Sequence, residues 1–290
     1  MVFLNGKLLP IEQASVSVLD RGFIFGDGVY ELVPVYSRVP FRLDEHLARL
    51  ERSLGEARIR DPYSRAQWCG HIYHLIDAQA FDDQSIYFQV TRGAAKRDHA
   101  FPKGVEPTVF MMANPLVNPP QAQVERGAAA VSATDNRWLR CDIKSISLIG
   151  NVLLRQLSAE AEAAETILFR DGRLTEASAS NVFIVKRGVI QSPPKSNLIL
   201  PGITYDVIAE LARANDLPIE FRPITEQEVR AADEIWVTSS SKEVLAIVTL
   251  DGKPVGDGRP GPVFRRMHQL YQEFKKKVMR AGKREAVSAA

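Results

Sequence analysis

The stretch RWLRCDIKSISLIGN, residues 137–151, places one lysine, Lys144, among apolar residues directly before a segment with helical periodicity. A lone lysine beside Ile143 and Ile146 usually packs its aliphatic stem on apolar surface while its amine reaches water. The pattern that follows predicts a helix over residues 145–165. Whether Lys144 has a chemical role therefore depends on the motifs that accompany it along the chain.

The residues before this stretch predict an α+β unit. VFLNGKLLP at the N-terminus has the Asn-Gly turn of a β-hairpin, and later runs rich in β-branched and aromatic residues predict strands. Leucines at helical spacing predict a helix between the first two of these runs. The predicted elements are a hairpin at 2–10, strands at 29–37, 85–93 and 108–114, and a helix at 46–59.

A stretch rich in proline and polar residues, ANPLVNPPQAQVERGA at 113–128, shows neither helical nor strand periodicity. It is typical of an interdomain connection and predicts a boundary near residue 118. The chain would then form a small domain over residues 1–118 and a larger one over 119–290. In the second, the patterns predict a strand at 127–133, the helix at 145–165, a strand, Asp-Gly turn and strand over 165–185, a helix at 204–216 and a strand at 234–241.

Composition narrows the class of protein. The chain has 290 residues, 45% of them hydrophobic, and a formal net charge of +2, so no strong field favours a nucleic-acid partner. Two cysteines do not form a disulfide framework, and Asn5, Gly6 and Lys7 interrupt the N-terminal apolar run before a signal-peptide core could form. No stretch approaches membrane-spanning length. We expect a cytoplasmic protein.

Three further segments hold groups that could bind a flat, anionic ligand. In LTEASASNVFIV, Glu176 precedes the small residues Ser178 and Ser180 in a run that otherwise suits a strand, although a solvated strand end fits the same residues. Gly202, Ile203 and Thr204 come directly before a helical pattern and could bind an anion, or Thr204 could be an ordinary helix cap. The hydroxyl run 238–241 of VTSSSKEV offers further donors or is simply a polar loop.

The sequence allows two interpretations of Arg49 and two of Arg97. Arg49 follows Glu45 by four residues, which is typical of a weak surface pair, but an inward-facing arginine could hold a phosphate in a bidentate fork. Arg97 and His99 are two apart, so in an extended segment both project to one side. With the hydroxyl of Tyr30 they could trap a carboxylate, although such a pair is more often solvated.

The order of these motifs, GDGVYE, HLARL, RCDIKS, LTEASASNVF, LILPGIT and the hydroxyl loop, resembles the fold-type IV pyridoxal-phosphate enzymes, also called class IV aminotransferases. The resemblance runs from the opening hairpin to the VTSSSKEV loop. It implies a two-domain fold, with a small α/β domain and a larger β-barrel-like domain with flanking helices that carries the catalytic lysine. It also implies a homodimer that acts on amino acids and 2-oxo acids.

By this resemblance, Lys144 forms the Schiff base with pyridoxal 5'-phosphate and Glu176 faces the pyridine nitrogen. A lysine amine can exchange an imine and then transfer a proton, whereas a guanidinium cannot be deprotonated. The phosphate would be held by Arg49, by the amides of Ile203 and Thr204, and by Ser240. No structural metal is expected, since His71 and His74 near Cys69 lack the further ligands such a site needs.

The RDH segment is similar to that of D-amino-acid aminotransferases, in which residues matching Tyr30, Arg97 and His99 hold the substrate's α-carboxylate. The implied reaction is D-alanine plus 2-oxoglutarate to pyruvate plus D-glutamate. A branched-chain L-amino-acid aminotransferase and an aminodeoxychorismate lyase share the cofactor residues and stay open as alternatives. A non-enzymatic ligand-binding protein on this fold is a remote one, since Lys144 and Glu176 argue against it.

Overall fold

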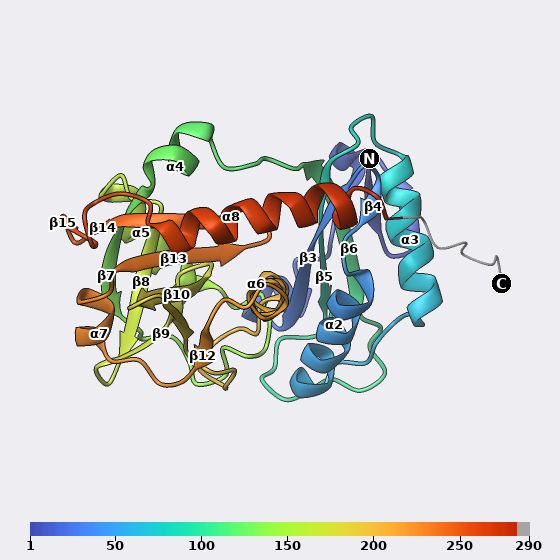
Figure 1. Cartoon of the computed structure of the whole chain (residues 1–290). Coiled ribbons are helices and arrows are strands. Elements are labelled where there is room, and N and C mark those ends of the chain that lie inside the picture. The colour runs from blue at the N-terminus through green and yellow to red at the C-terminus, as the bar shows by residue number, and fades with distance from the viewer. Residues whose placement is uncertain (283–290) are drawn as a thin grey trace. The chain divides into compact units, whose positions relative to one another are not determined.

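A computed structural model describes residues 1–282 of the chain, and these residues form two compact units (Figure 1). The first unit contains Met1–Leu116, Ile143–Leu148 and the described residues from Lys277 onward, and the second contains Val117–Asp142 and Ile149–Lys276. The boundary near residue 118 stays a prediction. The segment that carries Lys144 belongs to the first unit, although it was predicted in the larger C-terminal domain.

The first unit is built on a six-stranded antiparallel sheet with the strand order β2-β1-β6-β5-β3-β4. Asn5 and Gly6 have φ of 47° and 89°, the left-handed conformation that the predicted Asn-Gly hairpin requires. The strands are β1 (Val2–Leu4), β2 (Lys7–Leu9), β3 (Gly28–Tyr36), β4 (Val39–Pro40), β5 (Gln84–Thr91) and β6 (Thr108–Pro115). The helices are the 3-10 turn η1 (Ile11–Gln13), α1 (Arg21–Phe25), α2 (Leu43–Ala57) and α3 (Arg65–Asp77).

The core of this unit forms where α2 and α3 cover the sheet. Leu47, Leu50 and Leu54 recur at helical spacing along α2 and are at most 1% exposed, as the pattern predicted. They join Trp68 of α3 and Phe88 of β5 in one apolar cluster. This packing fixes α2 against β3, and both elements carry predicted site residues.

The second unit contains a nine-stranded mixed sheet in which β12-β11-β10-β13-β14-β7-β8-β9 are neighbours and β15 pairs with β14. A short turn joins β9 to β10, in which the Ala177 N–H donates to the Ser180 carbonyl. In the strand order, however, β9 is the last strand and four strands separate it from β10. The sheet must therefore curl, which confirms the barrel-like fold. The strands are β7 (Ala128–Thr134), β8 (Glu165–Arg170), β9 (Arg173–Ala177), β10 (Asn181–Lys186), β11 (Val189–Ser192), β12 (Ile219–Phe221), β13 (Glu234–Ser239), β14 (Glu243–Leu250) and β15 (Lys253–Pro254).

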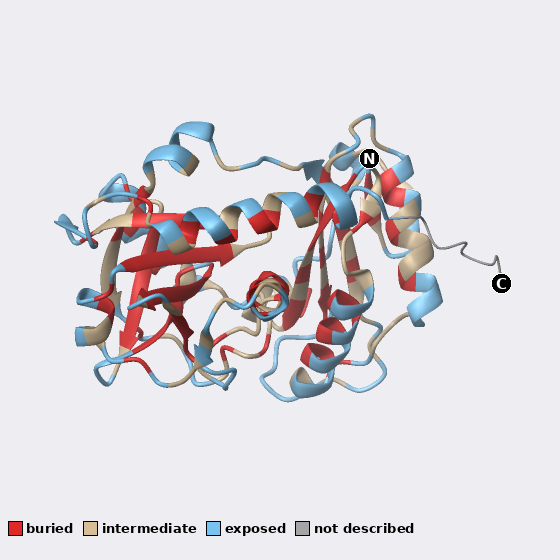
Figure 2. Cartoon of the chain, in the orientation of Figure 1, coloured by how far each residue is buried: buried red, intermediate tan, exposed pale blue. Residues whose placement is uncertain are grey.

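The central strands of this sheet are buried on both faces (Figure 2). Val182 and Ile184 of β10 belong to the cluster inside the curl, whereas Phe183 between them packs on Tyr205 and Trp236. This alternation follows from the two-residue period of a strand. The helices that cover or flank the sheet are α4 (Gln121–Arg126), α5 (Ile149–Glu160), α6 (Ile203–Ala214), α7 (Glu226–Arg230) and α8 (Pro262–Phe274), and a π-helical turn, η2 (Lys275–Met279), follows α8.

Three predicted elements differ from the structure. The helix expected from residue 145 begins only at Ile149, because the preceding residues are extended and pair with β3. The second strand expected within 165–185 is two strands, β9 and β10, separated at Ser178–Ser180. The proline-rich connection contains the short helix α4. The tail predicted beyond residue 282 lies outside the described residues, and among residues 1–282 no helix is long and apolar enough to cross a membrane.

Candidate active site

Lys144 lies on an extended segment, Ile143–Leu148, which we call the lysine segment and which pairs with the start of β3. The Tyr30 N–H donates to the Lys144 carbonyl oxygen at 2.8 Å, and the Ile146 N–H donates to the Gly28 carbonyl at 3.0 Å. The Lys144 N–H donates to Ser53 Oγ of α2 at 3.3 Å. The backbone is thus fixed on two sides. The Lys144 amine lies 4.0 Å from the centroid of the Tyr30 ring, within cation–π range.

Two glycines allow this close approach. A Cβ on Gly28 would lie 2.7 Å from the Val90 carbonyl oxygen and 2.8 Å from Ile146 Cδ1, closer than real Cβ contacts come. Gly26, with φ of 67°, ends α1 and lies against Ser147, whose Oγ donates to the Gly26 carbonyl at 2.8 Å. The GDG motif therefore serves to dock the lysine segment.

Arg49 faces inward, so the interpretation of a surface pair with Glu45 is wrong. It is 6% exposed, and its Nε and Nη2 donate to the two carboxylate oxygens of Glu31 at 2.7 and 2.8 Å. His46 Nδ1 lies 2.8 Å from the same carboxylate. Burial alone would raise the pKa of Glu31, but Arg49 and His46 outweigh it and hold that pKa far below its usual range.

His46 is the less usual member of this buried group. Burial lowers its pKa despite the Glu31 carboxylate, and the positive charges of Arg49 and Lys144 lower it further. A neutral His46 donates from Nδ1 to Glu31, which leaves Nε2 an acceptor. Nε2 is buried with no hydrogen-bond partner among the described residues. Arg49, the predicted phosphate ligand, is thus held next to β3, the strand that carries both Glu31 and Tyr30.

Arg97 and His99 both lie beside Phe25 of α1. Both are exposed, and both contact the Phe25 ring: the Arg97 guanidinium carbon is 5.3 Å from its centroid, and the His99 ring centroid is also 5.3 Å away. The buried Arg21 side chain donates to the Asp98 carbonyl at 2.5 Å and holds this loop. Among residues 1–282, no described contact joins Arg97 or His99 to Tyr30.

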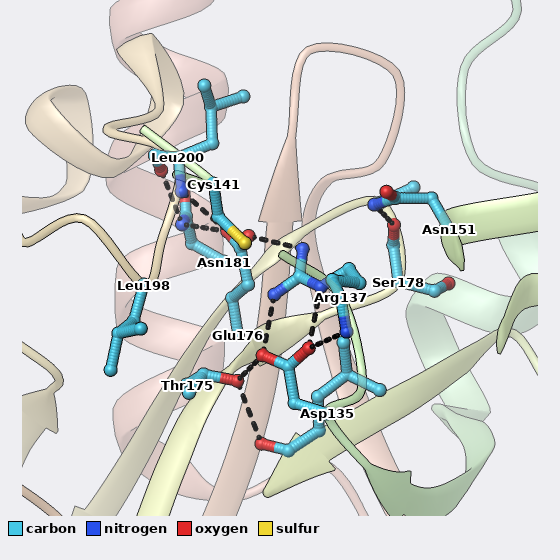
Figure 3. Close-up of polar contacts among 12 residues, drawn as sticks. Asp135, Arg137, Cys141, Asn151, Thr175, Glu176, Ser178, Asn181, Leu198 and Leu200 are labelled. Carbon is cyan, nitrogen blue, oxygen red and sulfur yellow. Dashed lines mark hydrogen bonds and ion pairs between the residues drawn. The ribbon is translucent and has the colours of Figure 1, made fainter. Parts of the chain in front are cut away.

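Glu176, at the end of β9, is the centre of a polar cluster in the second unit (Figure 3). Its Oε1 accepts from Arg137 Nη1 at 2.7 Å, and its Oε2 accepts from the Leu200 N–H at 3.0 Å and from Asn181 Nδ2 at 3.2 Å. Arg137 also forms a fork to both oxygens of Asp135, each at 2.9 Å. We call Asp135, Arg137, Glu176 and Asn181 the Glu176 cluster.

Burial dominates the electrostatics of Glu176. It raises the Glu176 pKa to about 7, although the charge and hydrogen bond of Arg137 oppose the shift. For Asp135 the balance is reversed, since burial would raise its pKa but Arg137 lowers it. The pKa of the neighbouring Cys141 thiol is raised to about 11, chiefly by burial, so Cys141 is a neutral thiol here. The cluster therefore contains a buried carboxyl group whose pKa is raised to about 7.

The start of α6 packs directly on this cluster. A Cβ on Gly202 would lie 2.2 Å from Asn181 Oδ1, so only glycine permits the contact. Ile203 and Thr204 are the first two residues of α6, where backbone N–H groups have no intrahelical partner. Thr238 pairs with Asn181 across the sheet, and its buried Oγ1 has no hydrogen-bond partner among the described residues. The structure thus gathers Glu176, the predicted anion-binding amides and an unsatisfied hydroxyl.

A second buried carboxylate organises the neighbouring turns. Glu165 of β8 accepts from Ser180 Oγ at 2.7 Å, from Lys242 Nζ at 3.1 Å and from the hydroxyl of Ser178. Lys242 lies in the same turn as Ser240, which is partly buried. Glu165 therefore links the Ser178–Ser180 turn to the hydroxyl turn between β13 and β14.

Asp135, Arg137 and Glu165 were not predicted as site residues from the sequence. An Asp-x-Arg pair just before the lysine stretch was the available signal for the first two. Within residues 1–282, neither Cys69 nor Cys141 is part of a disulfide. Within the described residues, no group of three or more histidine, cysteine or acidic side chains could hold a metal ion.

Comparison with known proteins defines the class. The amino-transferase class IV model matches residues 28–250, so the chain belongs to the class IV aminotransferase family. D-alanine aminotransferase of Bacillus licheniformis is 40% identical over 93% of this chain and 95% of its own length. The D-alanine aminotransferase of Staphylococcus aureus (strain MW2) is 39% identical over 94% of this chain and 97% of that protein. Among solved structures, a T.th. branched-chain amino acid aminotransferase with pyridoxamine 5'-phosphate matches with a TM-score of 0.89 at 25% identity, covering 94% of this chain and 92% of that one.

Proposed function

We propose that the protein is a pyridoxal-phosphate-dependent D-amino-acid transaminase that converts D-alanine and 2-oxoglutarate to pyruvate and D-glutamate. The names of the relatives that are about 40% identical over most of the chain support this substrate class. The observation that carries the proposal is Glu176, a buried carboxyl group aimed by three donors, because such a group suits a protonated pyridine nitrogen.

The donor set fits the cofactor in two respects. Glu176 Oε2 already accepts two hydrogen bonds, whereas Oε1 accepts one from Arg137 and so keeps a lone pair for a further donor. The N–H groups of Ile203 and Thr204 at the start of α6, with the hydroxyl of Ser240, suit a phosphate. When bound, pyridoxal phosphate supplies an aldehyde that takes up an amino group and a ring that withdraws electrons from the substrate α-carbon.

The chain's own residues would divide the remaining work. The Lys144 amine would hold the cofactor at its aldehyde carbon and, once released, would carry a proton at the substrate α-carbon. Glu176 would hold a proton at the pyridine nitrogen. Arg49 would complete the phosphate site, in addition to its ion pair with Glu31.

Substrate handedness would follow from carboxylate recognition. The α-carbon's C–H bond must face Lys144, so the position of the carboxylate decides which enantiomer is bound productively. Arg97, His99 and the Tyr30 hydroxyl would hold the carboxylate. Arg97 and His99 are already held together on Phe25 and are exposed, as a site that captures an ionic substrate from water requires.

We also propose a homodimer in the cytoplasm. One face of α5 exposes Ile149, Val152, Leu153 and Leu157, with exposed fractions of 72, 58, 61 and 45%. A contiguous apolar row of this kind marks an association surface, and we assign a second copy of the chain to it. Cys69 and Cys141 form no disulfide in the described part of the chain, and this suits a reducing compartment.

Borohydride reduction followed by peptide mass mapping tests the cofactor assignment. The cofactor should be fixed on Lys144 in the wild type, should be lost in Lys144→Ala, and should be unchanged in Lys253→Ala, whose side chain is exposed on β15. Paired assays with D- and L-amino acids and 2-oxoglutarate then test the reaction. A preference for L-valine or L-leucine would favour the branched-chain alternative, and pyruvate release from aminodeoxychorismate without an amino acceptor would favour the lyase.

A further inference from the structure

We propose that Arg137, anchored by Asp135, is a positioning residue that keeps Glu176 ionised and thereby keeps a proton on the ring nitrogen of bound pyridoxal phosphate. The inference rests on the proposed function, because it concerns the group that Glu176 would face.

The geometry assigns Arg137 to Glu176 as its fixed counter-ion. Its side chain is 5% exposed, and its Nε and Nη2 are both occupied by Asp135. Asp135 is itself held by the Thr175 hydroxyl, which donates to Oδ2 at 2.8 Å. Only Nη1 points to Glu176 Oε1, at 2.7 Å. Because two of its nitrogens are bound to Asp135, the guanidinium keeps its position when Glu176 gains another partner.

The charges around Glu176 alternate in sign. Arg170 Nη2 lies 3.1 Å from Asp135 Oδ1, Asp135 binds Arg137, and Arg137 binds Glu176. Cys141 also faces this cluster and, with its pKa raised chiefly by burial, stays a neutral thiol. Arg170 is the partly exposed end of the series, with a side chain 13% exposed, and Glu176 is the end that keeps an unused lone pair. The next group in the series should therefore be positively charged, as a protonated pyridine nitrogen is.

One proton can occupy two positions between Glu176 and the ring nitrogen. It can stay on nitrogen, which leaves a carboxylate and a pyridinium, or it can move to Oε1, which leaves a neutral acid and a neutral ring. In a buried site the neutral pair is favoured by desolvation. Arg137 opposes this, because its charge and hydrogen bond stabilise only the carboxylate. Without Arg137, the proton should move from the ring nitrogen to Oε1.

A purely structural role for Arg137 would predict something different. The Asp135 fork and the Arg170 contacts could simply hold the loop before the lysine segment. Loss of Arg137 would then change folding stability or cofactor affinity, but it would leave the proton on the ring nitrogen. The position of that proton separates the two roles.

The test uses the holoenzyme loaded with pyridoxal phosphate labelled with ¹⁵N in the ring, since the ¹⁵N chemical shift distinguishes a protonated from a neutral ring nitrogen. In the wild type, the signal should lie at the pyridinium position at pH 7.5. In Arg137→Gln it should move to the neutral-pyridine position, and in Arg137→Lys, which keeps the charge, it should stay near the wild-type value. Arg140→Gln is the matched control, because Arg140 forms the same fork to Asp142, with both bonds at 3.1 Å, on a partly exposed side chain.

Arg137→Gln leaves the buried Asp135 without its ion pair, so this variant could fail to fold. A second pair of variants, in which Asp135 is also neutralised, covers that case. Asp135→Asn should keep the pyridinium signal, whereas Asp135→Asn/Arg137→Gln should lose it. An unchanged pyridinium signal in both Arg137→Gln proteins would overturn the inference while leaving the proposed function intact. Failure of the wild-type protein to attach the cofactor to Lys144 would instead overturn the proposed function.

Discussion

At the scale of single residues, Glu176 couples folding to pH in the cofactor-free protein. Burial raises its pKa to about 7 from 4.5 in spite of Arg137. Between these two pH values the folded chain binds more protons at this site than the unfolded chain does. The free energy of unfolding should therefore fall as pH rises through this window, because stability decreases with pH wherever the folded state binds the extra proton.

Glu176→Gln should remove this dependence from the cofactor-free protein. The free energy of unfolding of the variant, relative to wild type, should rise by about 3 kcal/mol between pH 4.5 and pH 7, the equivalent of a shift of roughly two to three pKa units in a fully buried group. Urea denaturation at half-unit pH steps measures it. Glu125→Gln, on an exposed side chain, provides the control, and a pH-independent difference for Glu176→Gln would contradict the raised pKa.

The motifs identified the candidate residues but not their partners. Lys144 and Glu176 could be identified from the sequence because each is a reactive or charged group among residues of another kind. Arg137 could not be identified, because the direction of its side chain depends on β9 placing Glu176 beside the loop that holds Asp135. Arg49 was ambiguous for the same reason: the i,i+4 spacing to Glu45 is visible in the sequence, whereas the fork to Glu31 requires α2 to dock on β3.

At the scale of secondary-structure elements, the Glu31, His46 and Arg49 group joins α2 to β3. Arg49→Met would leave the Glu31 carboxylate buried with His46 as its remaining partner among the described residues. We expect this to lower the free energy of unfolding of the cofactor-free protein by about 3–5 kcal/mol, the range for removing one member of a buried ion pair. Chemical denaturation without cofactor measures the loss.

Arg52→Met is the matched control for this change, since Arg52 is exposed on the same helix. It should change stability by less than about 0.5 kcal/mol. If Arg49 served only the cofactor phosphate, Arg49→Met would leave the cofactor-free protein as stable as wild type and weaken cofactor binding alone.

The docking of the lysine segment on β3 depends on Gly28. Gly28→Ala would press a methyl group against Ile146 and the Val90 carbonyl, and overpacking of this kind costs about 1–3 kcal/mol. The segment should shift, so the fraction of cofactor fixed on Lys144 by borohydride should fall. Gly55→Ala on α2, where nothing lies within 4 Å of the added Cβ, should leave that fraction unchanged and slightly stabilise the helix.

Local patterns predicted most elements, and non-local contacts explain the exceptions. Residues 145–148 carry the apolar spacing of a helix, but Ser145 bridges Val29 and holds them extended. The run from 174 to 185 suits one strand, yet it is broken at Ser178–Ser180, where Glu165 from the preceding strand accepts both serine hydroxyls. Neither partner is near in sequence, so no window of neighbouring residues could reveal the interruption.

At the scale of the whole molecule, the residues proposed to bind the substrate carboxylate could come from one chain or from both chains of a dimer. Within one chain, Tyr30 lies beside Lys144, whereas Arg97 and His99 lie on Phe25, and no described contact joins the two sets. In a symmetric dimer, the loop that holds Arg97 and His99 could instead serve the Lys144 of the partner. Each active site would then need residues from both subunits.

Subunit complementation distinguishes the two arrangements. Lys144→Ala and Arg97→Ala homodimers should each transaminate D-alanine poorly. For the test, the two proteins are mixed, their subunits are exchanged under mild denaturation, and the mixture is refolded. If the trap acts across the dimer, each mixed dimer regains one complete site, so random exchange restores about one quarter of the wild-type sites. A mixture of Lys144→Ala with Lys144→Ala/Arg97→Ala is the control and should stay inactive. Sedimentation of the mixture confirms that dimers have re-formed, and dimers that regain no activity would place the trap and the lysine in the same chain.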